Sequence, residues 1–98
     1  MAEINWTREA EQWMQDIYDY IAQDNPEAAK RVVEGIYATV QLLQQFPRMG
    51  YKFQPKPEHN IRIIVHGHYR IAYLCKPDNT VDILGVFHRA LDITRYLF

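Results

Sequence analysis

Residues 61–92 read IRIIVHGHYRIAYLCKPDNTVDILGVFHRALD, and this stretch decides the fold. It contains three runs rich in Ile, Val and Tyr, at residues 61–66, 69–76 and 80–87. The connections between them are short and contain Gly, Pro, Asp and Asn. Short turns of this kind between such runs are typical of antiparallel hairpins, so the stretch predicts a three-stranded meander.

The chain upstream of the meander has the pattern of two helices. Apolar residues recur every three or four positions over residues 7–46, which predicts two amphipathic helices joined by a very short turn. Thr7 is a suitable N-cap for the first helix, and Asn25 followed by Pro26 is a restart signal for the second. Pro47 is expected to end the helical hairpin.

Short segments at both ends complete the predicted fold. Residues 2–6 are interpreted as a brief edge strand, and residues 89–97 as a short terminal helix. A further short strand is expected near residues 51–53. The helical hairpin would pack on one face of the sheet, which gives an α+β class for a single domain over residues 1–98. The aromatic stripe of the first helix is interpreted as core, and it comprises Trp6, Trp13 and Tyr20.

Charge is nearly balanced overall but unevenly distributed along the chain. The formal net charge is −1 and the pI about 6.4, whereas a free-standing nucleic-acid binder usually has a basic excess that neutralises phosphates. Eight of the 12 acidic residues lie in residues 1–47, and eight of the 11 basic residues lie in residues 48–98. The sheet half is therefore basic, which indicates that one face of it meets an anionic partner.

Other residue types narrow the expected chemistry. Cys75 is the only cysteine, so no internal disulfide can form, and a mid-strand cysteine is typical of a small core residue. Serine is absent, and no glycine-rich phosphate loop is present. His59, His66 and His68 are scattered around loops, so neither a metal nor another cofactor is expected. No apolar run has the length of a membrane span, so we expect a cytoplasmic protein without a membrane partner.

Three residues on the predicted strands are candidates for a functional site. Arg70 lies in mid-strand, where a guanidinium can bind a phosphate bidentately or pair within the fold with a carboxylate such as Asp82. Arg62 is either a second cation of the same site or a solvated edge charge. His88 ends the last strand, where it can act as a general acid or base or be structural. Its i, i+4 spacing from Asp92 would let the carboxylate orient the imidazole or form a local cap.

Features spread over nearly the whole chain occur together in one known family. They are Trp6-Thr7 with Ala10, the junction from Tyr20-Ile21-Ala22 to Asp24-Asn25-Pro26-Glu27-Ala28-Ala29, Leu43, Phe46-Pro47, Gly50, Gly67, Tyr69-Arg70-Ile71, Tyr73, Val81, Ile83-Leu84, Val86, His88 and Asp92. In this order and spacing the chain resembles the RelE/ParE toxin superfamily of bacterial type II toxin–antitoxin systems, and it is closer to the ParE-like branch.

The resemblance implies a toxin of the plasmid-stabilisation type, with a helical hairpin packed against an antiparallel sheet. It also implies a cognate antitoxin whose C-terminal segment folds along the toxin surface. Contact with operator DNA would be made only through that antitoxin.

The first hypothesis for the activity follows the ParE-like branch. Its members bind DNA gyrase and stall the complex with cleaved DNA, and they perform no known chemistry of their own. For this activity the resemblance implies a target- or antitoxin-binding surface made of Arg70, His88, Arg89, Asp92, Tyr96 and Phe98.

The alternative follows the RelE-like branch, whose members cleave mRNA on the ribosome. Such cleavage needs cations at the scissile phosphate and groups that move protons. The catalytic candidates would be Arg62, Arg70 and His88, so whether the chain is an enzyme stays open. The lysine-rich strand of several RelE-like nucleases is reduced here to Lys52 and Lys56, which favours the gyrase hypothesis. A third hypothesis is a diverged member that binds an antitoxin without being toxic.

Overall fold

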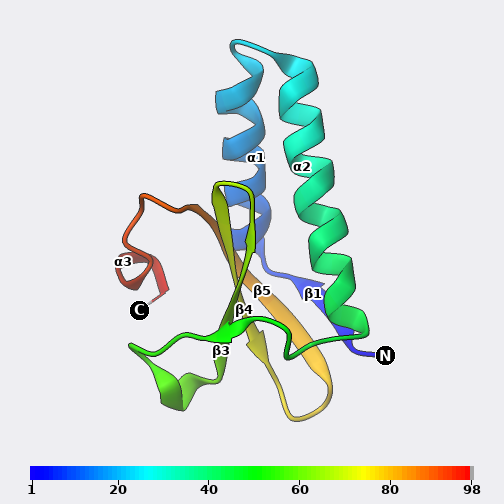
Figure 1. Cartoon of the computed structure of the whole chain (residues 1–98), viewed down its shortest axis with the longest axis vertical. Helices are drawn as coiled ribbons and strands as arrows, with labels where there is room; N and C mark the ends of the chain where they lie inside the picture. The colour runs from blue at the N-terminus through cyan, green and yellow to red at the C-terminus, as the bar shows by residue number, and fades with distance from the viewer. Residues whose placement is uncertain (98) are drawn as a thin grey trace.

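A computed structural model describes residues 1–97. Its elements in chain order are β1 (Glu3–Trp6), α1 (Arg8–Ala22), α2 (Pro26–Gln41), the 3-10 helix η1 (Leu42–Gln44), β2 (Tyr51–Lys52), the 3-10 helix η2 (Pro57–His59), β3 (Ile61–His66), β4 (Tyr69–Cys75), β5 (Thr80–His88) and α3 (Thr94–Leu97). α1 and α2 form a helical hairpin beside a five-stranded sheet (Figure 1). The predicted α+β class is confirmed.

Capping residues explain where the two long helices begin. The Thr7 hydroxyl accepts a hydrogen bond from the amide of Ala10 at 3.1 Å, and the Asn25 side chain accepts one from Ala28 at 3.1 Å. Pro26 occupies the first turn of α2, where its missing N–H removes no helical bond. Both predicted helix starts are confirmed.

The predicted end of the second helix at residue 46 is wrong. α2 ends at Gln41, and the chain tightens into η1, where the amide of Gln45 donates to the carbonyl oxygen of Leu42 at 3.2 Å. Leu43 remains fully buried within this tighter turn. The apolar stripe thus continues past the end of the α-helix, because a 3-10 turn can still direct one side chain into the core.

The sheet has the strand order β1-β5-β4-β3-β2. β3, β4 and β5 form the predicted antiparallel meander, and β2 extends it at one edge. β1 lies at the other edge and runs parallel to β5, with Ile4 opposite Val81. The N-terminal strand was expected at an edge, and the structure adds that its neighbour is the last strand of the chain.

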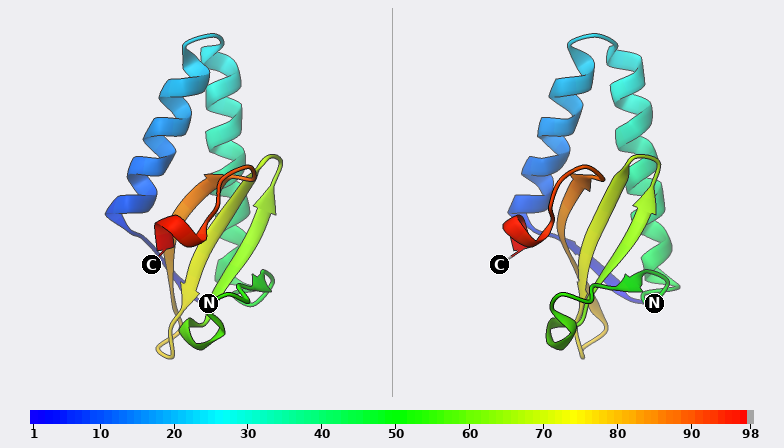
Figure 2. Two further views of the ribbon diagram at one scale, coloured as in Figure 1. Left: turned by 90° about the vertical axis from the view of Figure 1, so that its left-hand side faces the viewer. Right: turned by 60° about the vertical axis from the view of Figure 1, so that its left-hand side comes forward.

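Apolar side chains cover both faces of the sheet. The larger cluster lies between the sheet and the helical hairpin, and it includes Ile36, Ile71 and Tyr73. The smaller cluster lies on the other face, where Phe87 and Ile93 pack together under the C-terminal segment. Figure 2 shows that segment crossing the sheet on the side away from α2.

The helical hairpin extends beyond the end of the sheet (Figure 1). Trp13 is half-buried and contacts both core clusters. Tyr20 lies near the tip of the hairpin and is 76% exposed, so its interpretation as a core residue is wrong. On the same helix, Met14 is 3% exposed and belongs to the larger core cluster. Among residues 1–97, no helix combines the length and the apolar character that crossing a membrane requires.

Candidate functional site

Arg70 is bound to the backbone of the C-terminal segment. It lies on β4 opposite Phe87, and its side chain leaves the sheet on the face away from the hairpin, since its neighbour Ile71 packs in the hairpin core. Its Nη2 atom donates to the carbonyl oxygen of Leu91 at 2.7 Å and to that of Arg89 at 3.3 Å. Its Nε atom is buried and has no hydrogen-bond partner within residues 1–97.

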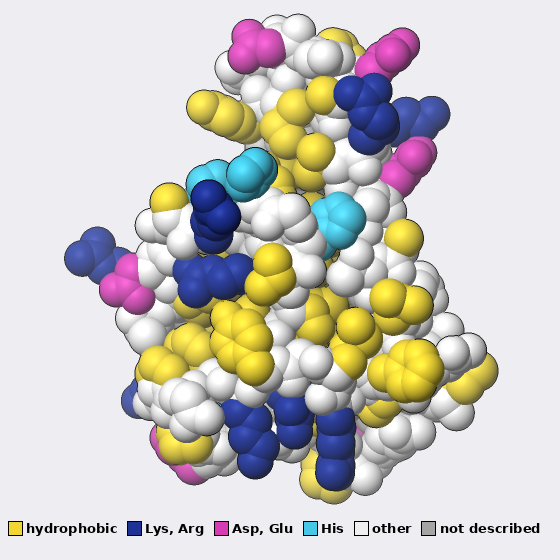
Figure 3. Space-filling view, viewed as in Figure 1, with side chains coloured by type: hydrophobic (Ala, Val, Ile, Leu, Met, Phe, Trp, Pro, Cys, Tyr) yellow, Lys and Arg dark blue, Asp and Glu magenta, His cyan; other side chains and the backbone are white. Residues whose placement is uncertain are grey.

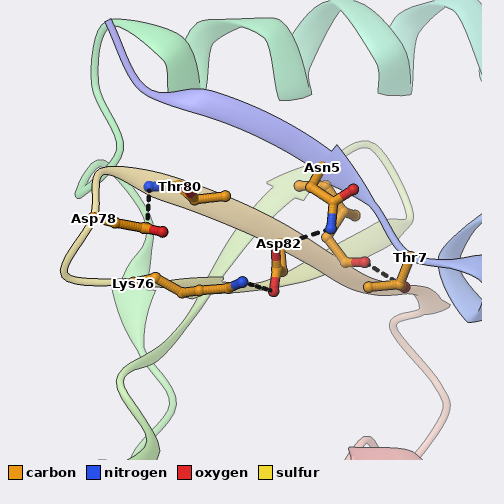
Figure 4. Close-up of polar contacts among 7 residues, drawn as sticks. Asn5, Thr7, Lys76, Asp78, Thr80 and Asp82 are labelled. Carbon is orange, nitrogen blue, oxygen red and sulfur yellow. Dashed lines mark hydrogen bonds and ion pairs between the residues drawn. The ribbon is translucent and has the colours of Figure 1, made fainter.

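Asp82 has partners other than Arg70. Its carboxylate forms an ion pair with Lys76 Nζ at 3.0 Å and accepts a hydrogen bond from Asn5 Nδ2 at 3.1 Å (Figure 4). The hydrogen bond and the charge of Asp82 raise the pKa of Lys76. The alternative in which Arg70 pairs with Asp82 is therefore wrong.

Arg62 lies on the opposite face of the sheet from Arg70. It is paired with Tyr73, which belongs to the hairpin core, whereas Arg70 is paired with Phe87 of the other cluster. The Nη1 atom of Arg62 donates to the carbonyl oxygen of Gly50 at 2.7 Å. Each sheet arginine thus binds backbone carbonyls of a different segment, and the two guanidinium groups do not converge.

His88 ends β5 on the hairpin side of the sheet, paired with Tyr69. Its Nδ1 atom accepts a hydrogen bond from the amide of Ala90 at 3.2 Å. Its ring lies 6.1 Å from that of His68 at an interplanar angle of 21°, and 5.7 Å from that of Tyr69. Figure 3 shows histidine side chains adjoining Lys or Arg side chains just below the protruding end of the hairpin. His88 is exposed and available to a partner.

Arg62 is also far from His88 along the strands. Arg62 is opposite Tyr73, and His88 is opposite Tyr69. These two partners are four positions apart on β4, which corresponds to about 13 Å of extended chain. The structure does not bring together the catalytic candidates Arg62, Arg70 and His88.

Asp92 forms a local cap. Residues 89–93 are not helical, and the predicted terminal helix is reduced to Thr94–Leu97. The Asp92 carboxylate accepts hydrogen bonds from the hydroxyl of Thr94 at 2.6 Å and from its amide at 3.2 Å, and it lies 3.8 Å from the Nε of Arg95. The bond from Thr94 is the main reason why the pKa of Asp92 is lowered. Of the two roles considered for Asp92, the local cap is the one formed.

Residues 89–97, here called the strap, are fixed to the sheet by apolar and aromatic contacts. Ile93 is 3% exposed within the smaller core cluster. The Tyr96 ring lies 5.1 Å from that of Trp13, in an edge-on arrangement, and 5.7 Å from that of Phe87. Tyr96 remains half-exposed, while Phe98 lies outside the described residues.

A groove of about 540 Å³ lies between α1 and the beginning of the strap. Its lining is mostly apolar and aromatic, and it comprises Trp13, Asp16, Ile17, Tyr20, Tyr69, Val86, His88 and Leu91. Burial, and to a smaller extent the nearby Tyr20, raises the pKa of the Tyr69 phenol. The groove is open and suits an apolar side chain from another molecule better than a small polar substrate.

Cys75 and the histidines show no arrangement typical of a metal centre. Within residues 1–97, no group of three or more His, Cys, Asp or Glu side chains is placed to hold a metal ion. The Cys75 thiol lies 3.4 Å from the carbonyl oxygen of Pro47, and burial raises its pKa. A thiol with a raised pKa is a poor nucleophile, which favours a structural role for Cys75 over a catalytic one.

Sequence reasoning did not assign several residues that the structure brings to the site. Tyr69 and Asp16 line the groove, His68 lies beside His88, and Ile93 anchors the strap. The position of His68 could have been predicted from the meander. His68 lies in the short turn between β3 and β4, and this turn adjoins the end of β5. The position of Asp16 depends on how the hairpin packs, which the periodicity of α1 alone does not give.

Comparisons with known proteins identify a toxin family that matches most of this chain. Residues 4–93 match the family model described as the ParE toxin of the type II toxin–antitoxin system parDE. The protein named "Putative toxin Y4kP" from Sinorhizobium fredii strain NGR234 is 34% identical over 85 residues, which is 87% of this chain and 85% of that protein.

Two solved structures have the same fold. The chromosomal ParDE system of P. aeruginosa superimposes with a TM-score of 0.72 and 26% identity, covering 90% of this chain and 96% of the other. The RelBE2 toxin–antitoxin complex of Mycobacterium tuberculosis gives a TM-score of 0.62 at 23% identity, covering 90% and 98%. The family match over most of the chain confirms the resemblance seen in the sequence: the chain belongs to the ParE toxin family of type II toxin–antitoxin systems, within the RelE/ParE superfamily.

Proposed function

We propose that this ParE-family toxin inhibits DNA gyrase by binding rather than by catalysis, and that a cognate antitoxin neutralises it. The observation that carries the proposal is the separation of the two sheet arginines. Arg62 and Arg70 leave the sheet on opposite faces, and each guanidinium is bonded to backbone carbonyls of its own chain. A site that cleaves RNA needs cations grouped around one phosphate, so this arrangement favours a binding surface.

The contact surface for gyrase is formed by the end of β5 and the strap. His88, Arg89, Asp92 and Tyr96 are all exposed there. Tyrosine and arginine are the residue types that most often carry the binding energy of protein interfaces. The near-neutral net charge of −1 also fits a protein target better than free nucleic acid.

Neutralisation by an antitoxin is supported by the likeness to the ParDE system of P. aeruginosa. The apolar groove beside His88 is a suitable place for a side chain of such a partner. Operator DNA would be contacted only through the antitoxin. The test is co-expression with the protein of the adjacent reading frame, which should be small and acidic and should restore growth. Growth arrest that persists despite complex formation would contradict neutralisation.

Purified protein incubated with gyrase and supercoiled plasmid tests the main proposal. We expect loss of supercoiling activity and accumulation of linear DNA from the stalled complex. A translating-ribosome assay run in parallel tests the alternative. Unaltered gyrase together with cuts in mRNA would overturn the proposal in favour of a RelE-like nuclease. Antitoxin binding with neither activity would identify a non-toxic member.

Substitutions on the strap make the test specific. Arg89→Ala and Tyr96→Ala should each weaken gyrase inhibition by about tenfold or more, which is the size expected for a main contact in an interface. Arg31→Ala is the matched control, because Arg31 is an exposed arginine on α2, away from the strap. Equal losses in Arg31→Ala and Arg89→Ala would show that the effect is one of general charge and not of this surface.

A further inference from the structure

The strap reaches its position through a short non-helical turn. After β5 the amide of Arg89 donates to the carbonyl oxygen of His68 at 2.8 Å, and the amide of Leu91 donates to that of His88 at 2.9 Å. The chain then crosses to the other face of the sheet, where Ile93 is buried. The strap therefore leaves the sheet from one face and is anchored on the other.

This crossing leaves backbone carbonyls that no secondary structure satisfies. The carbonyl oxygens of Arg89 and Leu91 belong to the turn between β5 and α3. The Leu91 carbonyl is part-buried and the Arg89 carbonyl is exposed, so a protein donor matters more for Leu91. The Nη2 atom of Arg70 satisfies both, at 3.3 Å and 2.7 Å, from the middle of a rigid strand.

The surroundings of Arg70 indicate that its guanidinium serves the strap and not a ligand. Its Nε atom is buried without a partner in the described chain, so this N–H is not directed at solvent where a phosphate would approach. The positive charge also makes a small contribution to lowering the pKa of Asp92, after the larger effects of Thr94 and Arg95. Arg70 thus acts on two neighbouring parts of the same segment.

We propose that Arg70 is a positioning residue that holds the strap in the geometry in which it contacts the target. The identity of the target rests on the proposed function, but the positioning role does not. Arg70 acts through Leu91 and Arg89, whose carbonyls it binds, and it makes no direct contact with the partner. The strap residues Asp92 and Tyr96 are presented in one fixed arrangement as a result.

Amide hydrogen exchange on the free protein tests the positioning role without any activity. In Arg70→Ala, the strap amides of Leu91, Tyr96 and Leu97 should exchange about tenfold faster or more, because their local opening becomes easier. The amides of β3, β4 and β5 should keep their protection, which shows that the variant is folded. Arg62→Ala is the matched control, since it should loosen the segment around Gly50 and leave the strap unchanged.

Arg70→Lys provides a second variant in case Arg70→Ala destabilises the whole sheet. A lysine keeps the charge and can donate to one carbonyl, but its flexible chain does not reproduce the planar fork of arginine. Its strap exchange should fall between that of the wild type and that of Arg70→Ala. Strap exchange equal to the wild type in both folded variants would overturn the positioning role.

A double-mutant cycle on gyrase inhibition separates positioning from direct contact. If Arg70 acts through the strap, adding Arg70→Ala to Tyr96→Ala should reduce inhibition much less than it does in the wild-type chain. Independent, multiplying losses would show that Arg70 contacts the target itself and would overturn the proposal. A wild-type chain that does not inhibit gyrase would refute the proposed function alone, because hydrogen exchange decides the positioning role separately.

Discussion

The imidazole of His66 lies directly over Gly35 of α2, so closely that a Cβ at position 35 would stand 2.5 Å from its Nε2 atom. The Nδ1 atom of His66 is 3.0 Å from the hydroxyl of Thr39, which itself donates to the carbonyl oxygen of Gly35 at 2.9 Å. The hydroxyl of Thr39 thus lies within hydrogen-bond distance of both the imidazole and the Gly35 carbonyl. This contact joins β3 to α2. It also explains why glycine occupies position 35 inside the helix, because a side chain there would collide with the imidazole.

The first prediction is that the effect of Gly35→Ala depends on His66. In a His66→Ala background, alanine at position 35 should stabilise the protein by about 0.5–1 kcal/mol, the usual gain over glycine in a helix. In the wild type the same change should give no gain, because the ring must leave Thr39. Urea unfolding of the four variants measures this. Equal effects of Gly35→Ala in both backgrounds would show that His66 does not require the glycine.

The second prediction concerns Tyr73, whose hydroxyl accepts the buried amide of Gly50 at 2.9 Å. Tyr73→Phe leaves this N–H without a partner, so it should cost about 1–3 kcal/mol of stability. Tyr51→Phe is the control, because Tyr51 is half-exposed on β2, and it should change stability by less than about 0.5 kcal/mol. Chemical denaturation of both variants measures the change in the free energy of unfolding. Similar changes in the two variants would contradict the prediction.

The third prediction concerns Thr7, which links α1 to the sheet. Its hydroxyl caps Ala10 and donates to the carbonyl oxygen of Ile83 at 2.6 Å, a contact drawn in Figure 4. Thr7→Ala should lower the free energy of unfolding by about 1–2 kcal/mol, as observed for strong N-caps. Thr7→Ser keeps the hydroxyl and should recover most of the loss in thermal unfolding. A serine variant as unstable as the alanine variant would point to the lost methyl group instead.

The fourth prediction is a pH dependence of the strap. The hydrogen bonds from Thr94 lower the pKa of Asp92 below its ordinary value of 3.8. Because the folded-state pKa is the lower one, the stabilisation is complete above pH 3.8 and is lost as the pH falls through the folded value. An NMR titration of the Thr94 amide should follow this change. In Thr94→Ala the pKa of Asp92 should rise, and an unchanged value would contradict the cap.

Local chemistry explains which parts of the fold could be predicted from the sequence. Thr7, and Asn25 with Pro26, act on amides within a few residues, so both helix starts were predictable. The end of α2 was not, because the apolar stripe through Leu43 is the same in an α-helix and in a 3-10 turn. The pairing of β1 with β5 depends on residues far apart in the chain, and a local pattern carries no information about it.

The candidate site was only partly predictable for a similar reason. Arg62 and Arg70 were recognised as unusual strand residues, but their faces depend on hairpin register, and a shift by one residue exchanges the two faces of a strand. The register between β4 and β5 also shifts between Ala72 and Tyr73. The face of a β5 residue therefore cannot be obtained by strict alternation along the strand. The distinction between a shared site and two separate backbone contacts therefore required the three-dimensional structure.

The parallel pairing of β1 with β5 has a consequence for synthesis of the toxin in the cell. Asn5 contacts Asp82 across 77 positions of the chain, so this edge of the sheet cannot form until residues 80–83 have left the ribosome. Contacts between distant residues also form slowly during folding. A nascent or prematurely terminated chain that lacks β5 cannot complete the sheet or carry the strap. The β1 edge of the sheet and the strap therefore both require that β5 has been synthesised.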